Sequence, residues 1–210
     1  VVSRLNAGSE ERLDAELFGL FETCEDVRTA SDGAFDITRG GALALDADRR
    51  TVRVLRGDID MGGIGKGFAV DLAAASLRES GVPGGFVHAG TSTCRGFGDA
   101  EGSPWSVRIG SDTTPTPFSI DVIDRALSVS GDEIQGAHII DPRTDSPVEG
   151  TVFGACTGPS AVLCDAWSTA LAVTGSRPDR MPSGCTSIMI RDNYWHAEPS
   201  GLRVLEEAVR

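Results

Sequence analysis

The sequence predicts an α+β fold in which mostly antiparallel β-sheets are flanked by helices. Three segments, 105–109, 118–123 and 126–130, alternate well and are separated by turn clusters, as in the strands of an antiparallel sheet. Two further segments, 64–77 and 160–174, repeat their apolar residues at helical spacing. With 210 residues, the chain fits one compact domain with ample length to bury a core.

The composition limits the classes of partner. The chain carries 31 acidic and 19 basic residues, for a net charge of −12. Nucleic acids are bound through cationic surfaces, so this balance argues against nucleic acid as a partner. No apolar run is long enough to span a bilayer. The five cysteines form no C-x-x-C pair, so neither a zinc site nor a thioredoxin-like pair is indicated; we expect most of them in the core, with a single disulfide left open.

The start of the chain predicts one long helix. Residues 1–6 are typical of the tail of an element that begins before the given sequence. Ser9 is placed to cap a helix that carries Glu10 and Glu11 in its first turn and ends at residues 32–33. The apolar face of this helix consists of Leu13, Leu17, Leu20, Phe21, Cys24 and Val27.

A short segment, 33–38, follows the helix and carries Phe35, which is expected to point inward, and the acid Asp36. Residues 42–45 and 51–55 then predict a pair of strands joined by turn residues.

A glycine-rich stretch, residues 58–71, joins a strand end to an amphipathic helix and contains Lys66, the only lysine of the chain. Its glycines are Gly62, Gly63, Gly65 and Gly67. Glycines are costly to order, and the usual reason for them is close approach of backbone N–H groups and a helix N-terminus to an anion. A tight turn with a surface lysine explains them about equally well. A Walker A loop and a G-x-G-x-x-G dinucleotide fingerprint are both excluded, since Gly67 follows the lysine and the run is G-G-x-G-x-G.

The second half of the chain predicts further strands and a polar loop. Residues 84–89 are typical of a buried strand, and residues 90–93 of a loop of small polar residues. Residues 151–156 predict another strand ahead of the helix 160–174. Residues 185–191 and 194–197 predict a closing hairpin with a two-residue turn.

A polar turn interrupts the apolar helix 160–174. Asp165 and Thr169 lie four residues apart and hence on one face, with Ser168 beside them. One carboxylate and two hydroxyls suit Mg²⁺, which also takes substrate phosphate and water as ligands. The neighbouring apolar residues predict that the helix is mostly buried, and a buried carboxylate needs a partner. A metal site and a hydrogen-bonded network are therefore comparable on spacing alone.

His138 opens a loop that is stiffened by Pro142. Such a histidine can serve as a general base, although a lone histidine is more often structural. We expect Asp141 and Arg143 to brace the loop through hydrogen bonds rather than to perform chemistry.

Five motifs follow one another along nearly the whole chain. They are Ser3-Arg-Leu-Asn6, Gly33-Ala-Phe-Asp36, Asp60-Met-Gly-Gly-Ile-Gly-Lys-Gly67, His138-Ile-Ile-Asp-Pro-Arg-Thr144 and Asp165-Ala-Trp-Ser-Thr169. The third and fourth are specific, whereas the first two are weak alone. In sequence and order they resemble the ApbE-type FAD:protein FMN transferase family, of which the chain looks like a short, divergent member.

The resemblance implies a single ApbE-like, T-fold-related domain over residues 1–210, with the N-terminal start of the domain missing. It implies Mg²⁺-dependent transfer of the FMN moiety of FAD to a Thr or Ser hydroxyl of an acceptor flavoprotein, with release of AMP. The alternatives are a non-catalytic FAD-binding module and an Mg²⁺-dependent FAD pyrophosphatase that gives FMN and AMP. The cell envelope is the location that the resemblance implies, with the cytoplasm as the alternative. No feature indicates an oligomeric state.

The resemblance also carries site residues onto this chain. Asp165, Ser168 and Thr169, together with Gly63, match the metal ligands of the family. His138 matches the histidine that is proposed to deprotonate the acceptor hydroxyl. The matches to flavin-dinucleotide contacts are Ala34, Phe35, Asp36, Asp60, Lys66 and Ile139. The set is chemically coherent, because phosphoryl-type transfer needs a metal, pyrophosphate contacts and a base.

The chain departs from the family pattern at three points. The segment with Trp and Phe-Gly that usually follows the second motif is absent. His88-Ala-Gly-Thr91 stands where Asn-x-Gly-Gly is common, and Asp145 replaces a usual glycine.

Overall fold

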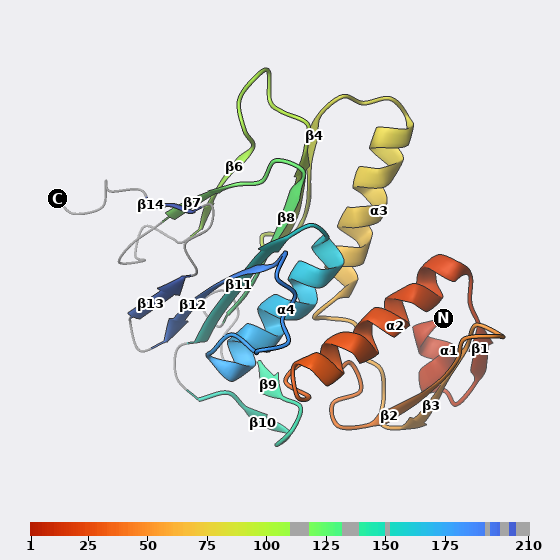
Figure 1. Cartoon of the computed structure of the whole chain (residues 1–210). Coiled ribbons are helices and arrows are strands. Elements are labelled where there is room, and N and C mark those ends of the chain that lie inside the picture. Colours follow the sequence, from red (N-terminus) through yellow and green to blue (C-terminus); the bar gives the residue numbers. More distant parts are fainter. Residues whose placement is uncertain (110–117, 132–138, 150–151, 192–193, 198–201, 205–210) are drawn as a thin grey trace.

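The computed structural model describes residues 1–109, 118–131, 139–149, 152–191, 194–197 and 202–204. Within these residues the paired strands all run antiparallel and form four sheets. Helices cover one side of the largest sheet (Figure 1). The predicted α+β class, with antiparallel sheets flanked by helices, is confirmed.

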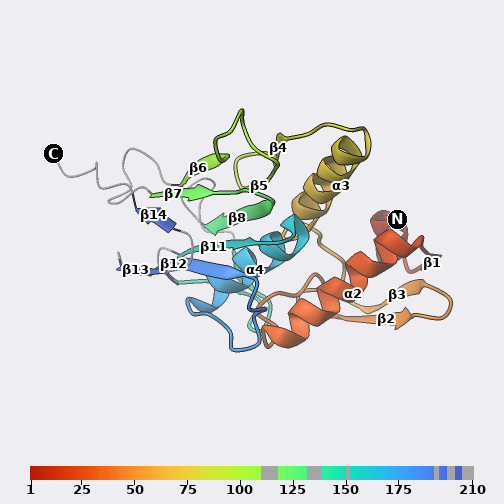
Figure 2. The same ribbon diagram turned by 45° about the horizontal axis from the view of Figure 1, so that its top comes forward.

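The largest sheet has six strands in the order β13-β12-β11-β8-β5-β4. Its strands are β4 (Gly85–Ala89), β5 (Thr93–Phe97), β8 (Arg125–Gly131), β11 (Val152–Gly158), β12 (Thr186–Arg191) and β13 (Tyr194–Ala197). Helices α3 (Gly65–Glu79) and α4 (Ala161–Thr174) pack beside it, and the three-stranded sheet β14-β7-β6 lies on its other side (Figure 2). The strands of that smaller sheet are β6 (Ser106–Ile109), β7 (Phe118–Asp121) and β14 (Leu202–Val204).

The side chains of β8 alternate between these two layers, as the period of a strand requires. Leu127 and Val129 belong to an apolar cluster shared with β6 and β7. Ser128 and Ser130 point the other way, where their hydroxyls meet side chains of α4. The buried helix-facing side of the sheet therefore carries polar groups, which need partners on the helix.

The N-terminal part differs from the prediction at the helix start. Residues 10–12 form strand β1 (Glu10–Arg12), which pairs with β3 (Thr51–Arg56), and β3 pairs in turn with β2 (Ala42–Asp46). The helix α2 (Ala15–Ala30) begins later, and its N-cap is Asp14, whose carboxylate accepts a hydrogen bond of 2.8 Å from the backbone N–H of residue 17. The prediction that Ser9 caps this helix was wrong, because long-range pairing with β3 draws Glu10 and Glu11 into a sheet. The strand pair at 42–45 and 51–55 is confirmed.

The first residues form a short helix, α1 (Val2–Asn6). The amide of Asn6 donates to the carbonyl oxygen of Ile59 over 3.1 Å and accepts from its N–H over 2.8 Å. This double hydrogen bond fixes the backbone at the start of the glycine-rich stretch, ahead of its glycines.

Three further predictions need correction. Strand β4 is half-buried rather than buried, because it forms the edge of its sheet. The predicted loop 90–93 ends one residue early, since Thr93 opens β5 and pairs with Ser128 of β8. The loop 138–144 contains the short strand β9 (Ile140–Asp141), paired with β10 (Ser146–Pro147). The closing hairpin is confirmed as β12 and β13.

The five cysteines are buried and free, as expected for small core residues. Burial raises the pKa of Cys24 to about 12 and that of Cys94 to about 11, so both thiols stay protonated at neutral pH. Among the described residues, no helix has the length and apolar character to cross a membrane.

Candidate functional site

A cavity of about 1260 Å³ is lined by the glycine-rich stretch, by α4, and by strands of the six-stranded sheet and of the β14-β7-β6 sheet. It collects most of the residues predicted for the site. Those that line it are Ala34, Phe35, Asp36, Asp60, Gly63, Lys66, Ile139 and Thr169. Another part of its wall is apolar and comes from Phe86, Val107, Ile109, Leu127, Val129 and Phe153. A large cavity with an apolar wall and a few convergent polar groups is typical of a small-molecule site.

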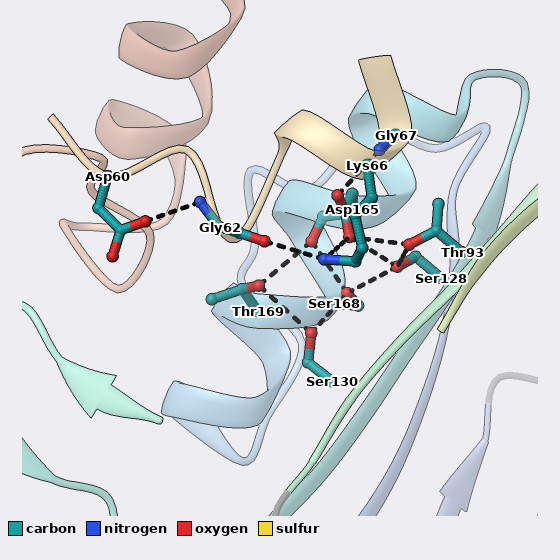
Figure 3. Close-up of polar contacts among 10 residues, drawn as sticks. All are labelled: Asp60, Gly62, Lys66, Gly67, Thr93, Ser128, Ser130, Asp165, Ser168 and Thr169. Atoms are coloured by element: carbon teal, nitrogen blue, oxygen red, sulfur yellow. Dashed lines mark hydrogen bonds and ion pairs between the residues drawn. The ribbon is translucent and has the colours of Figure 1, made fainter. Parts of the chain in front are cut away.

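Asp165 lies just behind this lining and is 1% exposed. One carboxylate oxygen accepts hydrogen bonds of 3.0 Å from the hydroxyls of Thr93 and Ser128, and the other accepts one of 3.0 Å from the backbone N–H of Gly67. The ammonium of Lys66 lies 3.5 Å from the first oxygen (Figure 3). A buried carboxylate is tolerated only when it is paired and hydrogen-bonded, and this one is both.

Helices α3 and α4 each supply a carboxylate that accepts a hydrogen bond from a backbone N–H in the first turn of the other helix. Asp165 of α4 accepts from the first turn of α3 at Gly67, and Asp71 of α3 accepts from the first turn of α4 at Val162, over 3.0 Å. Arg95 pairs with Asp71 at 2.6 Å. Negative charge is favourable at a helix N-terminus. Asp165 therefore supplies, from within the protein, the negative charge that we expected at the start of α3.

Three of the four glycines of the stretch differ in how closely other atoms approach them. A Cβ on Gly67 would lie 2.2 Å from the carbonyl oxygen of Ala161, so this position requires glycine for close contact between α3 and α4. A Cβ on Gly63 would lie 3.0 Å from the hydroxyl of Thr169, which is a tight contact on the cavity wall. At Gly65 the nearest atom would be a Met61 side-chain carbon at 3.5 Å, an ordinary contact.

Hydroxyl groups continue the network from Asp165 to the cavity. Ser168 donates to the carbonyl oxygen of Asp165 over 2.9 Å, and the hydroxyl of Ser130 lies 2.9 Å from that of Ser168. The hydroxyl of Thr169 lies 3.3 Å from that of Ser130 and 3.3 Å from the Asp165 carbonyl (Figure 3). The motif residues had led us to expect Ser168 and Thr169 here, whereas Ser130 comes from the sheet. Its signal in the sequence is a polar residue at every second position of a strand that packs against an apolar helix.

Asp36 is buried, and its carboxylate builds the turn that follows it. One oxygen accepts from the N–H and hydroxyl of Thr38 at 2.8 and 2.6 Å. The other accepts from the N–H of Gly40 at 2.9 Å and lies 3.3 Å from Nε of Arg28. Asp36 thus lines the cavity, while both of its oxygens are already bonded within the protein.

Asp60 has a similar role on the glycine-rich stretch. One oxygen accepts from the N–H of Gly62 over 2.8 Å, and the other is paired with the guanidinium of Arg39. The carbonyl of Gly62 in turn accepts from the ammonium of Lys66 over 2.9 Å (Figure 3). Arg39, Asp60, Gly62, Lys66 and Asp165 therefore form one continuous chain of contacts that borders the cavity.

The polar groups around Asp165 suit Mg²⁺ only when phosphate oxygens and water complete its coordination. Among the described residues no three His, Cys, Asp or Glu side chains converge on one point, so a cage made only of such side chains is absent there. The Lys66 ammonium lies 3.5 Å from the carboxylate of Asp165 and 2.9 Å from the carbonyl of Gly62, and the Thr169 hydroxyl bonds the backbone carbonyl of Asp165. Mg²⁺ uses such sparse sites together with phosphate oxygens and water. A cation is already held at this point, because the Lys66 ammonium contacts both Gly62 and Asp165.

The loop after residue 138 is braced as predicted. Arg143 donates from Nε and a terminal nitrogen to the two carboxylate oxygens of Asp141, at 2.8 and 2.7 Å. These hydrogen bonds lower the pKa of Asp141. Asp145 adopts a left-handed φ of 52°. His138 lies outside the described residues, and its neighbour Ile139 lines the cavity.

The comparisons with known proteins agree with this geometry. Residues 43–181, more than half of the chain, match the ApbE family. The FAD:protein FMN transferase of Rhodobacter capsulatus is 28% identical in an alignment of 217 residues with gaps, which covers 80% of this chain and 40% of that protein. The enzyme of the same name from Escherichia coli K12 is 31% identical over 130 residues, or 56% and 37% of the two chains. The chain thus spans about two fifths of the length of these relatives.

Solved structures support the same fold. The flavin transferase ApbE of Vibrio cholerae superposes with a TM-score of 0.79 at 21% identity, over 95% of this chain and 81% of that one. The ApbE protein of Thermotoga maritima gives a TM-score of 0.77 at 23% identity, over 98% and 81%. From the family match and this shared fold we conclude that the chain belongs to the ApbE family.

Proposed function

We propose that the chain binds FAD in the cavity and transfers its FMN moiety to a Thr or Ser hydroxyl of an acceptor flavoprotein, with release of AMP. The observation that carries the proposal is the contact between Lys66 and Asp165. It joins the glycine-rich stretch to the polar turn of α4, behind the wall of a cavity of about 1260 Å³. The relatives named FAD:protein FMN transferase support FAD as the substrate.

The transfer is a displacement at phosphorus. The acceptor oxygen attacks the phosphorus on the FMN side of the pyrophosphate, and the bond from that phosphorus to the bridging oxygen breaks. AMP leaves with the bridging oxygen, and His138 takes the proton of the attacking hydroxyl. The apolar wall that includes Phe86, Val107 and Phe153 suits a flavin ring and keeps water from it.

We further propose that Asp165 and Thr169 hold Mg²⁺ against the pyrophosphate, together with Ser168 and the backbone at Gly63. Bound there, the ion would neutralise charge that develops on the transferring phosphoryl group. In this arrangement Lys66 leaves the carboxylate of Asp165 and contacts a phosphate oxygen instead. The protein's own cation thus keeps the site neutral until substrate and metal arrive together.

The first test uses the chain, FAD, Mg²⁺ and a Thr-containing acceptor peptide, followed by mass spectrometry of the peptide. A mass gain equal to FMN is expected, and a chelator should abolish it.

We expect FAD to bind more tightly than FMN or riboflavin, since Lys66 and the metal address the dinucleotide half. His138→Ala should keep FAD affinity and lose transfer, because a base acts in the attack.

In the transfer assay of the parent, free FMN and AMP would identify a pyrophosphatase instead, and unchanged FAD a binding module.

A second test concerns the exchange of cations at Asp165. If the ammonium of Lys66 and Mg²⁺ compete for this carboxylate, Lys66→Gln should strengthen Mg²⁺ binding to the FAD-free protein by about tenfold, or about 1.4 kcal/mol. The same variant should weaken FAD binding. Calorimetric titration with Mg²⁺ measures the first effect, and Lys66→Arg, which keeps the charge, is the control. Equal Mg²⁺ affinities in the parent and Lys66→Gln would contradict the exchange.

A further inference from the structure

Arg39 is held over the cavity by an unusual turn. Its backbone φ is 50° and that of Gly40 is 81°, so two successive residues occupy the left-handed region. For arginine this conformation is uncommon and costs free energy, and it persists only where the surroundings impose it. They do so here, because the carboxylate of Asp36 accepts from the N–H groups of Thr38 and Gly40, on either side of Arg39. The turn therefore fixes the direction in which the arginine leaves the backbone.

The side chain of Arg39 is paired with an acid that another anion can replace. Its guanidinium contacts the carboxylate of Asp60, and the two side chains are 56% and 47% exposed. Ion pairs at this exposure contribute little stability, so another anion can take the place of the carboxylate at small cost. Asp60 stays in position when that happens, since its other oxygen accepts from the N–H of Gly62.

Three acidic residues at the cavity are each paired with one basic residue. Asp36 is matched by Arg28, Asp60 by Arg39 and Asp165 by Lys66. The whole chain carries a net charge of −12, which repels an anionic ligand unless positive charge is concentrated locally. Arg39 and Lys66 both line the cavity and are joined through Asp60 and Gly62.

We propose that Arg39 binds a pyrophosphate oxygen of the dinucleotide, and that Asp60 is its holding partner in the free protein. The planar fork of a guanidinium matches two phosphate oxygens better than a point charge does. Lys66 and Arg39 then approach the two phosphates from the two ends of one hydrogen-bonded segment. Arg39 thereby selects a phosphate-bearing flavin over riboflavin. This inference rests on the proposed function, because it takes FAD as the ligand.

The test compares two arginines that lie beside the same turn. Arg39→Gln removes the proposed contact and keeps a residue with a side chain at the strained position. The matched control is Arg56→Gln, since Arg56 donates to the carbonyl of Gly40 over 2.8 Å but is not among the cavity-lining residues. Affinities for FAD and riboflavin are measured by calorimetry at low and high salt, together with the melting temperature of each variant.

We expect Arg39→Gln to weaken FAD binding by about tenfold or more, with riboflavin affinity unchanged and a shallower salt dependence. Arg56→Gln should bind both flavins like the parent, and Arg39→Lys should recover part of the loss. Melting temperatures should stay close to that of the parent, because the lost pair is exposed.

Two outcomes separate the inference from the proposed function. Binding of FAD by the parent with equal affinity in Arg39→Gln overturns the role of Arg39 and leaves the proposed function standing. Equal losses in Arg39→Gln and Arg56→Gln overturn it too, since they would indicate a non-specific charge effect. Absence of FAD binding by the parent overturns the proposed function, and the inference with it.

Discussion

The Asp165→Ala variant is expected to lose about 2–4 kcal/mol of folding stability, the range for breaking a buried charged network. The substitution removes the common acceptor of the Gly67 N–H and of the Thr93 and Ser128 hydroxyls, and leaves the Lys66 ammonium without its carboxylate. For a chain of this length the loss corresponds to a fall in melting temperature of roughly 5–15 °C. Thermal unfolding of the metal-free protein measures it.

Thr169→Val is the matched control for this variant. It is nearly isosteric and removes one hydroxyl, whose two contacts are both 3.3 Å long, so the melting temperature should change little. If Mg²⁺ also binds here, Thr169→Val should nevertheless reduce the Mg²⁺ dependence of FAD affinity. A parent-like melting temperature for Asp165→Ala would show that the network contributes little and that the acid serves the ligand alone.

Gly67→Ala is expected to destabilise the protein by about 3 kcal/mol or more. The added Cβ would stand 2.2 Å from the carbonyl oxygen of Ala161 and 2.9 Å from Cβ of Asp165. Since the obstructing atom is backbone, α3 and α4 must move apart, which also stretches the hydrogen bond from Gly67 to Asp165. Chemical denaturation monitored by circular dichroism measures the effect.

Gly65→Ala provides the comparison within the same helical turn. Its Cβ would meet nothing closer than 3.5 Å, and alanine loses less backbone entropy than glycine at this first position of α3. This variant should therefore be as stable as the parent or more stable. If Gly67→Ala behaved like Gly65→Ala, the close contact between the two helices would not limit stability.

The sequence was most informative where function and local pattern coincide. The polar turn of α4 was visible because Asp165 interrupts an apolar helix, and the glycine-rich stretch because four glycines surround the only lysine. The structure brings these two segments together at the contact of Lys66 with Asp165. Of the two alternatives that spacing left open for Asp165, the structure shows the hydrogen-bonded network, and the metal site stays a prediction.

The rest depended on partners that are distant in sequence. Ser9 looks like an N-cap until β1 pairs with β3, about forty residues away, and that pairing overrides the local preference. Thr93 and Ser128 could be assigned to no site, because their roles follow from the register between β5 and β8. Asp36 was read as a ligand contact, whereas its carboxylate also builds the turn beneath Arg39.

The contacts between Asp165 and its partners also bear on how the protein folds. Asp165 bonds residues 98, 72 and 37 positions away, and Asp71 reaches 91 positions to α4. Each such contact closes a long loop, whose entropy must be spent before the contact forms. We therefore expect the contacts of Asp165 to form late in folding, after the local helices and hairpins. A fragment that carries the glycine-rich stretch alone is likewise expected to lack the cavity, since Asp165, Thr93 and Ser128 all come from later in the chain.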